Sequence, residues 1–197
     1  MRSARSGILS LISSALWWVI CSAAPLMEFS GDPGFQQFLR KNEEFALKIN
    51  SDVVAMKDRM REEFKLGNDS ELQLLREILA IQQVTLNCHS SLCNVEDCFN
   101  QIWTGLQTYK SYLIRVAEVL PSYANQVTSL QLDVSNLSAN IQQQMEESGL
   151  PTVSYPQAET KVLPNLESQK QIGSYIILNY FKGFLEMTIR ALRHCGA

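Results

Sequence analysis

The sequence predicts an all-α fold, a long-chain four-helix bundle, and three observations support this prediction. Apolar residues recur at spacings of three, four and seven in four separate stretches, which is the pattern of helices that bury one face. No stretch shows the sustained apolar–polar alternation typical of a strand. All six prolines lie outside the interiors of these stretches, as expected because proline disrupts the interior of a helix.

The first two helices are predicted on either side of a long connection. Asp32 and Pro33 form a cap and a first-turn proline, from which a helix of about 30 residues, roughly 45 Å long, extends. Its expected buried face is Phe38, Phe45, Ile49, Val53, Met56, Met60 and Phe64. The second helix ends at Pro121, and its expected buried face is Phe99, Ile102, Leu106, Tyr109, Leu113, Val116 and Leu120.

The third and fourth helices complete the predicted bundle. The third ends at Gly149, an expected C-terminal cap, and its apolar face is Val127, Leu130, Val134, Leu137, Ile141 and Met145. The fourth covers residues 168–194, and its wider apolar arc is Ile172, Ile176, Leu178, Phe181, Leu185, Met187 and Leu192. Because Lys182, Glu186 and Arg190 interrupt this arc, we predict a core helix of the bundle and not a membrane span.

The lengths of the connections predict the topology. About 30 residues separate the first two helices and about 18 the last two, whereas only a turn around Pro121 separates the second from the third. In the first long connection, the letters SELQ at 70–73 predict a short helix with a capping box. A connection of 18 residues can reach about 60 Å and cross the length of the bundle. Long, short and long connections give up-up-down-down with two long crossovers, the architecture of cytokine and growth-hormone bundles.

The N-terminus has the layout of a secretory signal peptide. Arg2 and Arg5 precede an apolar run at 8–21, and small residues follow it. We expect cleavage after Ala23, so that residues 1–23 are the signal peptide and residues 24–197 are the mature domain. An uncleaved anchor is the alternative, but the run is short for a membrane span and no second run is long enough. The sequence therefore predicts a secreted, extracellular protein without membrane insertion.

The sequence carries no recognisable catalytic or cofactor motif. It lacks a nucleophile–base pair, a glycine-rich phosphate loop and a metal-ligand constellation, and it contains two histidines. Cys88, Cys93 and Cys98 with His89 are an alternative zinc site, but their spacing fits no common zinc finger and secretion favours disulfides. The net charge of −3 argues against nucleic acid as a partner. We therefore expect a binding protein and not an enzyme, with no cofactor and no metal.

Two motifs resemble one known family. The letters LQLDV at 130–134, followed by QQMEE at 143–147 and Gly149, resemble the third helix of the granulocyte colony-stimulating factor family. The letters FLE at 184–186, with Arg190 and LRH at 192–194, resemble the end of its fourth helix. The first helix and the start of the first crossover also match, so the resemblance covers nearly all of residues 34–195. We expect a non-mammalian member of this family.

The resemblance implies two receptor-binding regions. In that family, contacts come mainly from the first and third helices, and residue by residue this surface is Lys41, Glu44, Lys48, Leu132, Asp133 and Asn136. Glu71 falls in a second region near the start of the first crossover. The helical pattern independently places Leu132 about 170° from the centre of the apolar face, and therefore outward. The alternative is an ordinary exposed leucine beside a solvated face with weak Glu–Lys pairs.

The four cysteines after the signal peptide are expected to form disulfides. The resemblance maps the second disulfide of the family onto Cys88 and Cys98. In the predicted topology, the fourth helix ends where the second begins, which brings Cys195 near this segment. We therefore expect a second pair, Cys93 with Cys195.

The chain also departs from the family pattern. Arg61 and Gly67 stand where the first disulfide of the family needs cysteines, so that disulfide is absent. Asn136 replaces an aspartate and creates a glycosylation sequon on the implied receptor face. Because a glycan there would block this face, we expect Asn136 to be unmodified or the surface to be shifted. Asn68, in the first crossover, is the better candidate for glycosylation.

Together, the sequence and the resemblance predict a secreted cytokine. It would bind and cross-link the extracellular domains of a granulocyte colony-stimulating factor type receptor, drive proliferation and differentiation of granulocytes, and be a monomer before receptor engagement. One alternative is another long-chain helical cytokine, of the interleukin-six or leptin type. Another is a secreted helical carrier whose Met56, Met60 and Met145 line an apolar pocket, although methionines at core spacing are usually filler.

Overall fold

The computed structural model of the chain describes residues 31–66, 79, 81–88, 94–151, 166 and 169–195. The chain divides into two units, Met1–Asp32 and Pro33–Ala197, and the second contains every helix described below. The expected signal peptide at 1–23 and the expected short helix from Ser70 lie outside the described residues. Both remain predictions.

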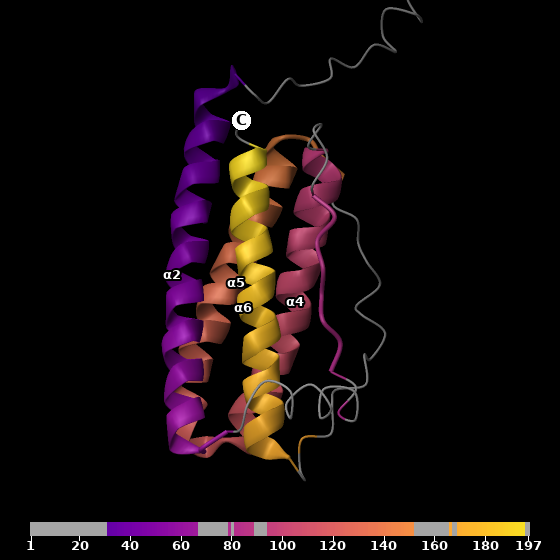
Figure 1. The fold of residues 1–197 in the computed structure, drawn as a ribbon. Helices are drawn as coiled ribbons and strands as arrows, with labels where there is room; N and C mark the ends of the chain where they lie inside the picture. Colours follow the sequence, from indigo (N-terminus) through magenta and orange to yellow (C-terminus); the bar gives the residue numbers. More distant parts are fainter. Residues whose placement is uncertain are drawn as a thin grey trace, which may run out of the picture. The chain divides into compact units, whose positions relative to one another are not determined.

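The second unit is the predicted all-α four-helix bundle (Figure 1). Its long helices are α2 (Pro33–Glu63), α4 (Val95–Val119), α5 (Ala124–Glu147) and α6 (Lys170–His194), with a 3₁₀ turn, η2 (Pro121–Tyr123), between α4 and α5. The described residues contain no β-strand. In Figure 1, α2 and α4 run in one direction and α5 and α6 return in the other, which is the predicted up-up-down-down topology.

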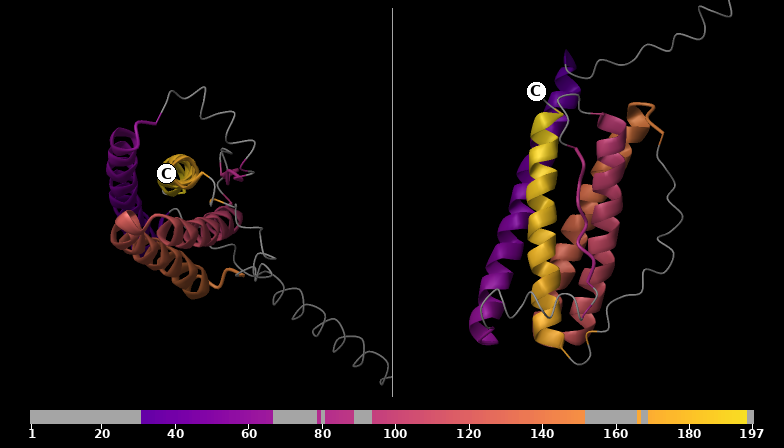
Figure 2. Two further views of the ribbon diagram at one scale, coloured as in Figure 1. Left: turned by 90° about the horizontal axis from the view of Figure 1, so that it is seen from below. Right: turned by 45° about the vertical axis from the view of Figure 1, so that its right-hand side comes forward.

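Each helix lies beside two antiparallel neighbours. Helix α2 contacts α5 and α6, and α4 contacts the same two helices, as the end-on view in Figure 2 shows. The α2–α6 and α4–α5 interfaces are more extensive than the α2–α5 interface. We call the line along which α2 and α5 meet the α2–α5 seam. It brings the first and third predicted helices side by side, although α4 lies between them in sequence.

The helix ends follow from local chemistry. The side chain of Asn94 accepts a hydrogen bond from the backbone of Asp97 and caps the N-terminus of α4. Gly149 has a φ of 65°, its N–H donates to the carbonyl of Glu146, and the next N–H, of Leu150, donates to that of Met145. This pair of hydrogen bonds is a Schellman motif, and it confirms Gly149 as the cap that ends α5.

The buried face of α2 differs from the predicted one. Phe38, Phe45 and Phe64 are only half-buried, whereas Phe35, Leu39 and Ala46 are fully buried, together with the predicted Ile49, Val53, Met56 and Met60. Phe38 and Phe45 each lie one position before a buried residue, and Phe64 lies just beyond the last residue of α2. The apolar arc of α2 is therefore wider than the buried strip, and packing against both α5 and α6 decides which part is covered.

The same correction applies to α6. Ile172 and Met187 are half-buried, while the buried face also includes Tyr175, Ile177 and Phe184, which the sequence pattern did not include. Because α6 packs against both α2 and α4, it buries more than one stripe of its circumference.

An aromatic cluster joins α4 to α6 in the core. The ring of Tyr109 lies 4.9 Å from that of Phe181 and 5.1 Å from that of Phe184, measured between centroids. Gly105, one turn before Tyr109, leaves the space that the Phe184 ring occupies, and a Cβ at this position would overlap that ring. The absence of a side chain at Gly105 therefore allows α4 and α6 to approach closely.

The end of α2 is attached to α6 by polar and aromatic contacts. The Arg61 guanidinium lies 5.8 Å from the ring of Tyr175, and Lys57 Nζ lies 5.6 Å from the same ring. Lys57 Nζ also donates to Asn179 Oδ1 at 2.9 Å. Cations over an aromatic face are attracted to its π electrons. In this chain, Arg61 therefore makes a packing contact at a position where the family pattern has a cysteine.

Candidate functional site

An ion pair bridges the middle of the α2–α5 seam. Lys48 Nζ on α2 lies 2.7 Å from Asp133 Oδ2 on α5 and 3.1 Å from Asp52 Oδ2, one turn further along α2. The Lys48 side chain is 56% exposed and that of Asp133 is 17% exposed. The hydrogen bonds to Asp133 and Asp52 raise the pKa of Lys48 above its ordinary value, against a smaller opposing effect of burial. Lys48 is therefore a fixed positive charge with a defined position at the surface.

The other two α2 residues of the expected surface are also exposed. Lys41, Glu44 and Lys48 span seven positions, about 10 Å along the helix axis. Lys48 does not form the Glu–Lys pair of the alternative interpretation, because its ammonium is turned to Asp52 and Asp133 instead. Within the described part of the chain, Glu44 has no ion-pair partner. Its carboxylate is therefore available to a cation from outside.

On α5, the structure confirms that Leu132 points outward. Its side chain is 62% exposed, the highest value among the large apolar residues described as exposed. Asp133 follows it directly, and Asn136 is exposed one turn later. We call the surface formed by Lys41, Glu44, Lys48, Leu132, Asp133 and Asn136 the α2–α5 face. The structure brings together its two halves through the Lys48–Asp133 ion pair.

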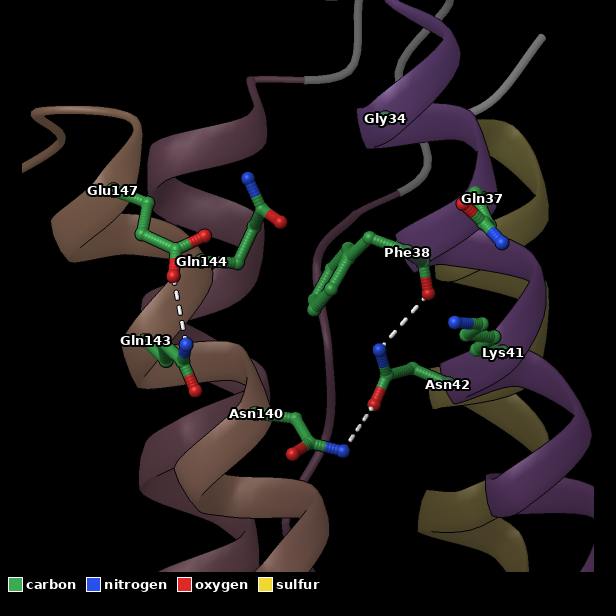
Figure 3. A pocket seen from close by; sticks show the side chains of 9 residues that line it. All are labelled: Gly34, Gln37, Phe38, Lys41, Asn42, Asn140, Gln143, Gln144 and Glu147. Carbon is green, nitrogen blue, oxygen red and sulfur yellow. Dashed lines mark hydrogen bonds between the residues drawn. The ribbon is translucent and has the colours of Figure 1, made fainter.

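Two surface hollows flank this ion pair along the seam. One, of about 290 Å³, is shown in Figure 3 and is lined by Gly34, Gln37, Phe38, Lys41, Asn42, Asn140, Gln143, Gln144 and Glu147. The other, of about 270 Å³, is lined by Asp52, Ala55, Met56, Arg59, Gln126, Ser129 and Leu130. Residues from both α2 and α5 line each hollow, so the two helices are less closely packed on either side of the Lys48–Asp133 bridge.

A second polar bridge lies at the edge of the first hollow. Asn140 Nδ2 on α5 donates to Asn42 Oδ1 on α2 at 2.9 Å, and Asn42 Nδ2 donates to the carbonyl of Phe38 at the same distance (Figure 3). Neither asparagine was predicted as a functional residue from the sequence. A signal was present, because Asn42 falls between Leu39 and Ala46 at the spacing of the buried face, where a polar residue needs a partner.

Cys88 and Cys98 form the disulfide bond that the resemblance implied, with their Cα atoms 5.4 Å apart. These two sulfur atoms are therefore not available as zinc ligands, and no cluster of metal-ligating residues occurs within the described ranges. Cys195 is buried and disulfide-bonded, and it directly follows α6, which ends at the end of the bundle where α4 begins (Figure 1). Its expected partner Cys93 lies outside the described residues, so this pairing stays a prediction.

Two further residues of the predicted site are outside the described part of the chain. They are Glu71, of the second receptor-binding region, and Asn68, the preferred glycosylation candidate. Asn136 is exposed, whereas Ser138 of the same sequon is buried and accepts a hydrogen bond from Gln107 Nε2 at 2.7 Å. Among the helices that the structure describes, none is both long and apolar enough to span a membrane.

The fold and this site together define a class of protein. The bundle has long helices in up-up-down-down order, and its distinguishing surface is an exposed, charged face over two helices. These features are those of the long-chain four-helix cytokines.

Comparison with known proteins identifies the family. The sequence model of granulocyte colony-stimulating factor matches residues 46–193. The chain is 43% identical over 189 residues to myelomonocytic growth factor of the chicken, Gallus gallus, and the match covers 94% of each sequence. It is 34% identical over 187 residues to granulocyte colony-stimulating factor of the cat, Felis catus (94% and 95% covered), and 33% identical over 192 residues to that of Homo sapiens (94% and 90% covered). The chain therefore belongs to the granulocyte colony-stimulating factor family.

Membership in this family bears on the other functions considered from the sequence. The family consists of cytokines and not of enzymes, and its members are growth factors with the long-chain four-helix fold. The family is therefore that of granulocyte colony-stimulating factor and not the interleukin-six or leptin type. Met60 and Met145, which the carrier alternative places around a pocket, are fully buried in the core. The higher identity to the chicken protein than to the cat and human proteins is consistent with a non-mammalian member.

Proposed function

We propose that this chain is a secreted cytokine that binds a granulocyte colony-stimulating factor type receptor through the α2–α5 face. The observation that carries this proposal is the Lys48–Asp133 ion pair, which joins the residues implied on α2 and α5 into one continuous surface. The mature protein would be a monomer that cross-links two receptor chains, and the second region at Glu71 would contact the other chain. The cross-linked receptors would signal for proliferation and differentiation of granulocytes.

The chemistry of the face supports a protein partner. Leu132 offers an exposed apolar side chain on a face whose other members are charged or amide residues, a composition that suits an interface centre with a polar rim. Glu44 offers an exposed carboxylate that pairs with no cation among the described residues, and a receptor arginine or lysine would neutralise it. Lys48 and Asp133 already satisfy each other, so their role is to present charge in a fixed geometry and to set the register of the complex.

The test is a titration of the full chain, secreted from cultured animal cells, onto the ectodomain of a granulocyte colony-stimulating factor receptor. We expect saturable binding, and N-terminal sequencing of the secreted protein should begin at Ala24. Glu44→Lys should weaken binding at least tenfold, which corresponds to about 1.4 kcal/mol. Absence of saturable binding by the folded, secreted protein would refute the proposed function.

A matched control separates the face from general charge effects. Asp58 is an exposed acid on the same helix, about 21 Å from Glu44 along the axis. Asp58→Lys makes the same change of net charge and should leave the affinity within about twofold. An equal loss of affinity in both variants would mean that the charge of the whole protein, and not the α2–α5 face, determines binding.

The proposal of two regions is tested by stoichiometry. Glu71→Lys should retain binding of one receptor chain through the α2–α5 face but lose the complex that contains two. Analytical ultracentrifugation of mixtures with excess receptor ectodomain distinguishes the two complexes. If the Glu71→Lys variant still forms the complex that contains two receptor chains, the second region does not lie at Glu71.

A further inference from the structure

The Asn42–Asn140 bridge lies in the α2–α5 seam, an interface less extensive than the α2–α6 and α4–α5 interfaces. Fewer residues of α2 and α5 meet than in the α2–α6 and α4–α5 interfaces, and hollows of about 290 and 270 Å³ open along the seam. Apolar interdigitation therefore restrains the sliding of α2 against α5 less than it restrains those two pairs. Directional polar contacts across the seam contribute more to its register.

Asn42 is a polar side chain in a buried position. It is 3% exposed and lies in the strip that otherwise buries Phe35, Leu39, Ala46 and Ile49. Its Oδ1 accepts from Asn140 Nδ2, and its Nδ2 donates to the Phe38 carbonyl within α2, so both ends of the amide are satisfied. A buried amide whose partner is on another helix disfavours shifted registers, because a shift leaves the amide unpaired.

The bridge is close to the α2–α5 face. Asn42 precedes Lys48 by six residues on α2, and Asn140 follows Asp133 by seven on α5, which places the two bridges about 10 Å apart along the antiparallel seam. Asn42 lies between Lys41 and Glu44 in sequence, and Asn140 lies one turn after Asn136. A slide of one residue, about 1.5 Å, would break the amide hydrogen bond and displace the α2 half of the face against the α5 half.

We infer that Asn42 and Asn140 are positioning residues, which hold α2 and α5 in the register that aligns the two halves of the α2–α5 face. This inference rests on the proposed function for its consequence in receptor binding. The two asparagines affect receptor binding indirectly, because they set the positions of Lys41, Glu44, Asp133 and their neighbours. The pair specifies a geometry more than it contributes to stability, since a buried amide such as that of Asn42 and its partner can often be replaced by apolar groups at little cost.

The test uses the double variant Asn42→Leu/Asn140→Ala. Leu has nearly the shape of Asn, and both substitutions favour helix formation. We therefore expect an unfolding midpoint equal to or above that of the native protein, with at least a fivefold loss of receptor affinity. Asn140→Gln, which keeps an amide donor at this position, should retain the affinity within about twofold. If the double variant does not fold, Asn140→Ala alone, at an exposed position, serves as the second variant.

A matched control removes a different hydrogen bond between helices. Gln107 Nε2 on α4 donates to Ser138 Oγ on α5 at 2.7 Å, in the α4–α5 interface. Gln107→Leu/Ser138→Ala should leave receptor affinity unchanged. An equal loss of affinity in this control would assign the effect to general loosening of α5 and would overturn the inference.

A second measurement does not depend on the receptor. Spin labels at exposed Ser51 on α2 and Thr128 on α5 report the distance between the two helices by pulsed electron resonance. The native chain should give one narrow distance distribution, and the Asn42→Leu/Asn140→Ala variant a shifted or broadened one. An unchanged distribution in the variant would overturn the inference, whatever the receptor data show. If the native protein does not bind the receptor, the proposed function fails while the distance measurement still decides the role of the bridge.

Discussion

Exchange of the charges of the Lys48–Asp133 pair separates a structural role from a receptor-binding role. The double variant Lys48→Asp/Asp133→Lys keeps an ion pair across the α2–α5 seam but reverses its direction. In the native chain, Lys48 Nζ lies 2.7 Å from Asp133 Oδ2, and its side chain is 56% exposed. An ion pair so accessible to water and salt contributes at most about 1 kcal/mol to stability.

The expected magnitudes follow from this exposure. Asp133→Lys alone places two cations at the seam and should lower the free energy of unfolding by about 1 kcal/mol, which is about 2–4 °C in midpoint for a domain of this size. The double variant should recover most of this loss, less a few tenths of a kcal/mol because the aspartate introduced in place of Lys48 would face Asp52 on the same helix. Both effects should shrink as salt is added, since the pair is at the surface.

Receptor binding should behave differently. A partner complementary to the native charges meets reversed charges in the double variant, so affinity should stay at least tenfold below native even where stability is restored. Thermal unfolding followed by circular dichroism at 222 nm gives the stability, and surface plasmon resonance with receptor ectodomain gives the affinity. Recovery of native affinity in the double variant would refute the reasoning, because the pair would then act only by joining α2 to α5.

Three further predictions follow from the core, the turn and the cysteines. Gly105→Ala places a methyl group against the Phe184 ring and should lower the free energy of unfolding, measured by urea denaturation, by about 1–3 kcal/mol. Adding Phe184→Leu to this variant should recover part of the loss. If the effects of the two substitutions are simply additive, the two positions do not interact. Burial, and then the hydrogen bond to a carboxylate, raises the pKa of Tyr123 from 10.0 to about 12. Between pH 10 and 12 the Tyr123 hydroxyl loses its proton in the unfolded chain but keeps it in the folded one, so its stabilising contribution is complete below pH 10 and falls as the pH rises to 12. Tyr123→Phe should therefore reduce the fall of the urea unfolding midpoint over this pH range. An unchanged pH dependence of the midpoint would contradict this role of Tyr123. Non-reducing peptide mapping should find Cys93 linked to Cys195, and two free thiols would exclude this disulfide.

Much of the bundle could be predicted because its signals are local. The spacing of apolar residues at three and four positions identifies a helix from one segment alone, and Pro121 and Gly149 mark ends by their backbone preferences. The outward direction of Leu132 follows from the same periodicity and was predicted correctly. Connection lengths added the order of the helices, because a short link cannot return along the bundle.

The four helices, their up-up-down-down order and the outward direction of Leu132 all follow from the amino-acid pattern. Three features became visible only in the folded bundle: which part of the α2 surface is buried, that Gly105 accommodates Phe184, and that Lys48 pairs with Asp133. The folded bundle also decided the contact of Asn42 with Asn140, which lie 98 positions apart. The physical reason is that helical periodicity depends on neighbouring residues, whereas a contact between helices depends on the rotation and register of both, which the packing of the whole bundle sets.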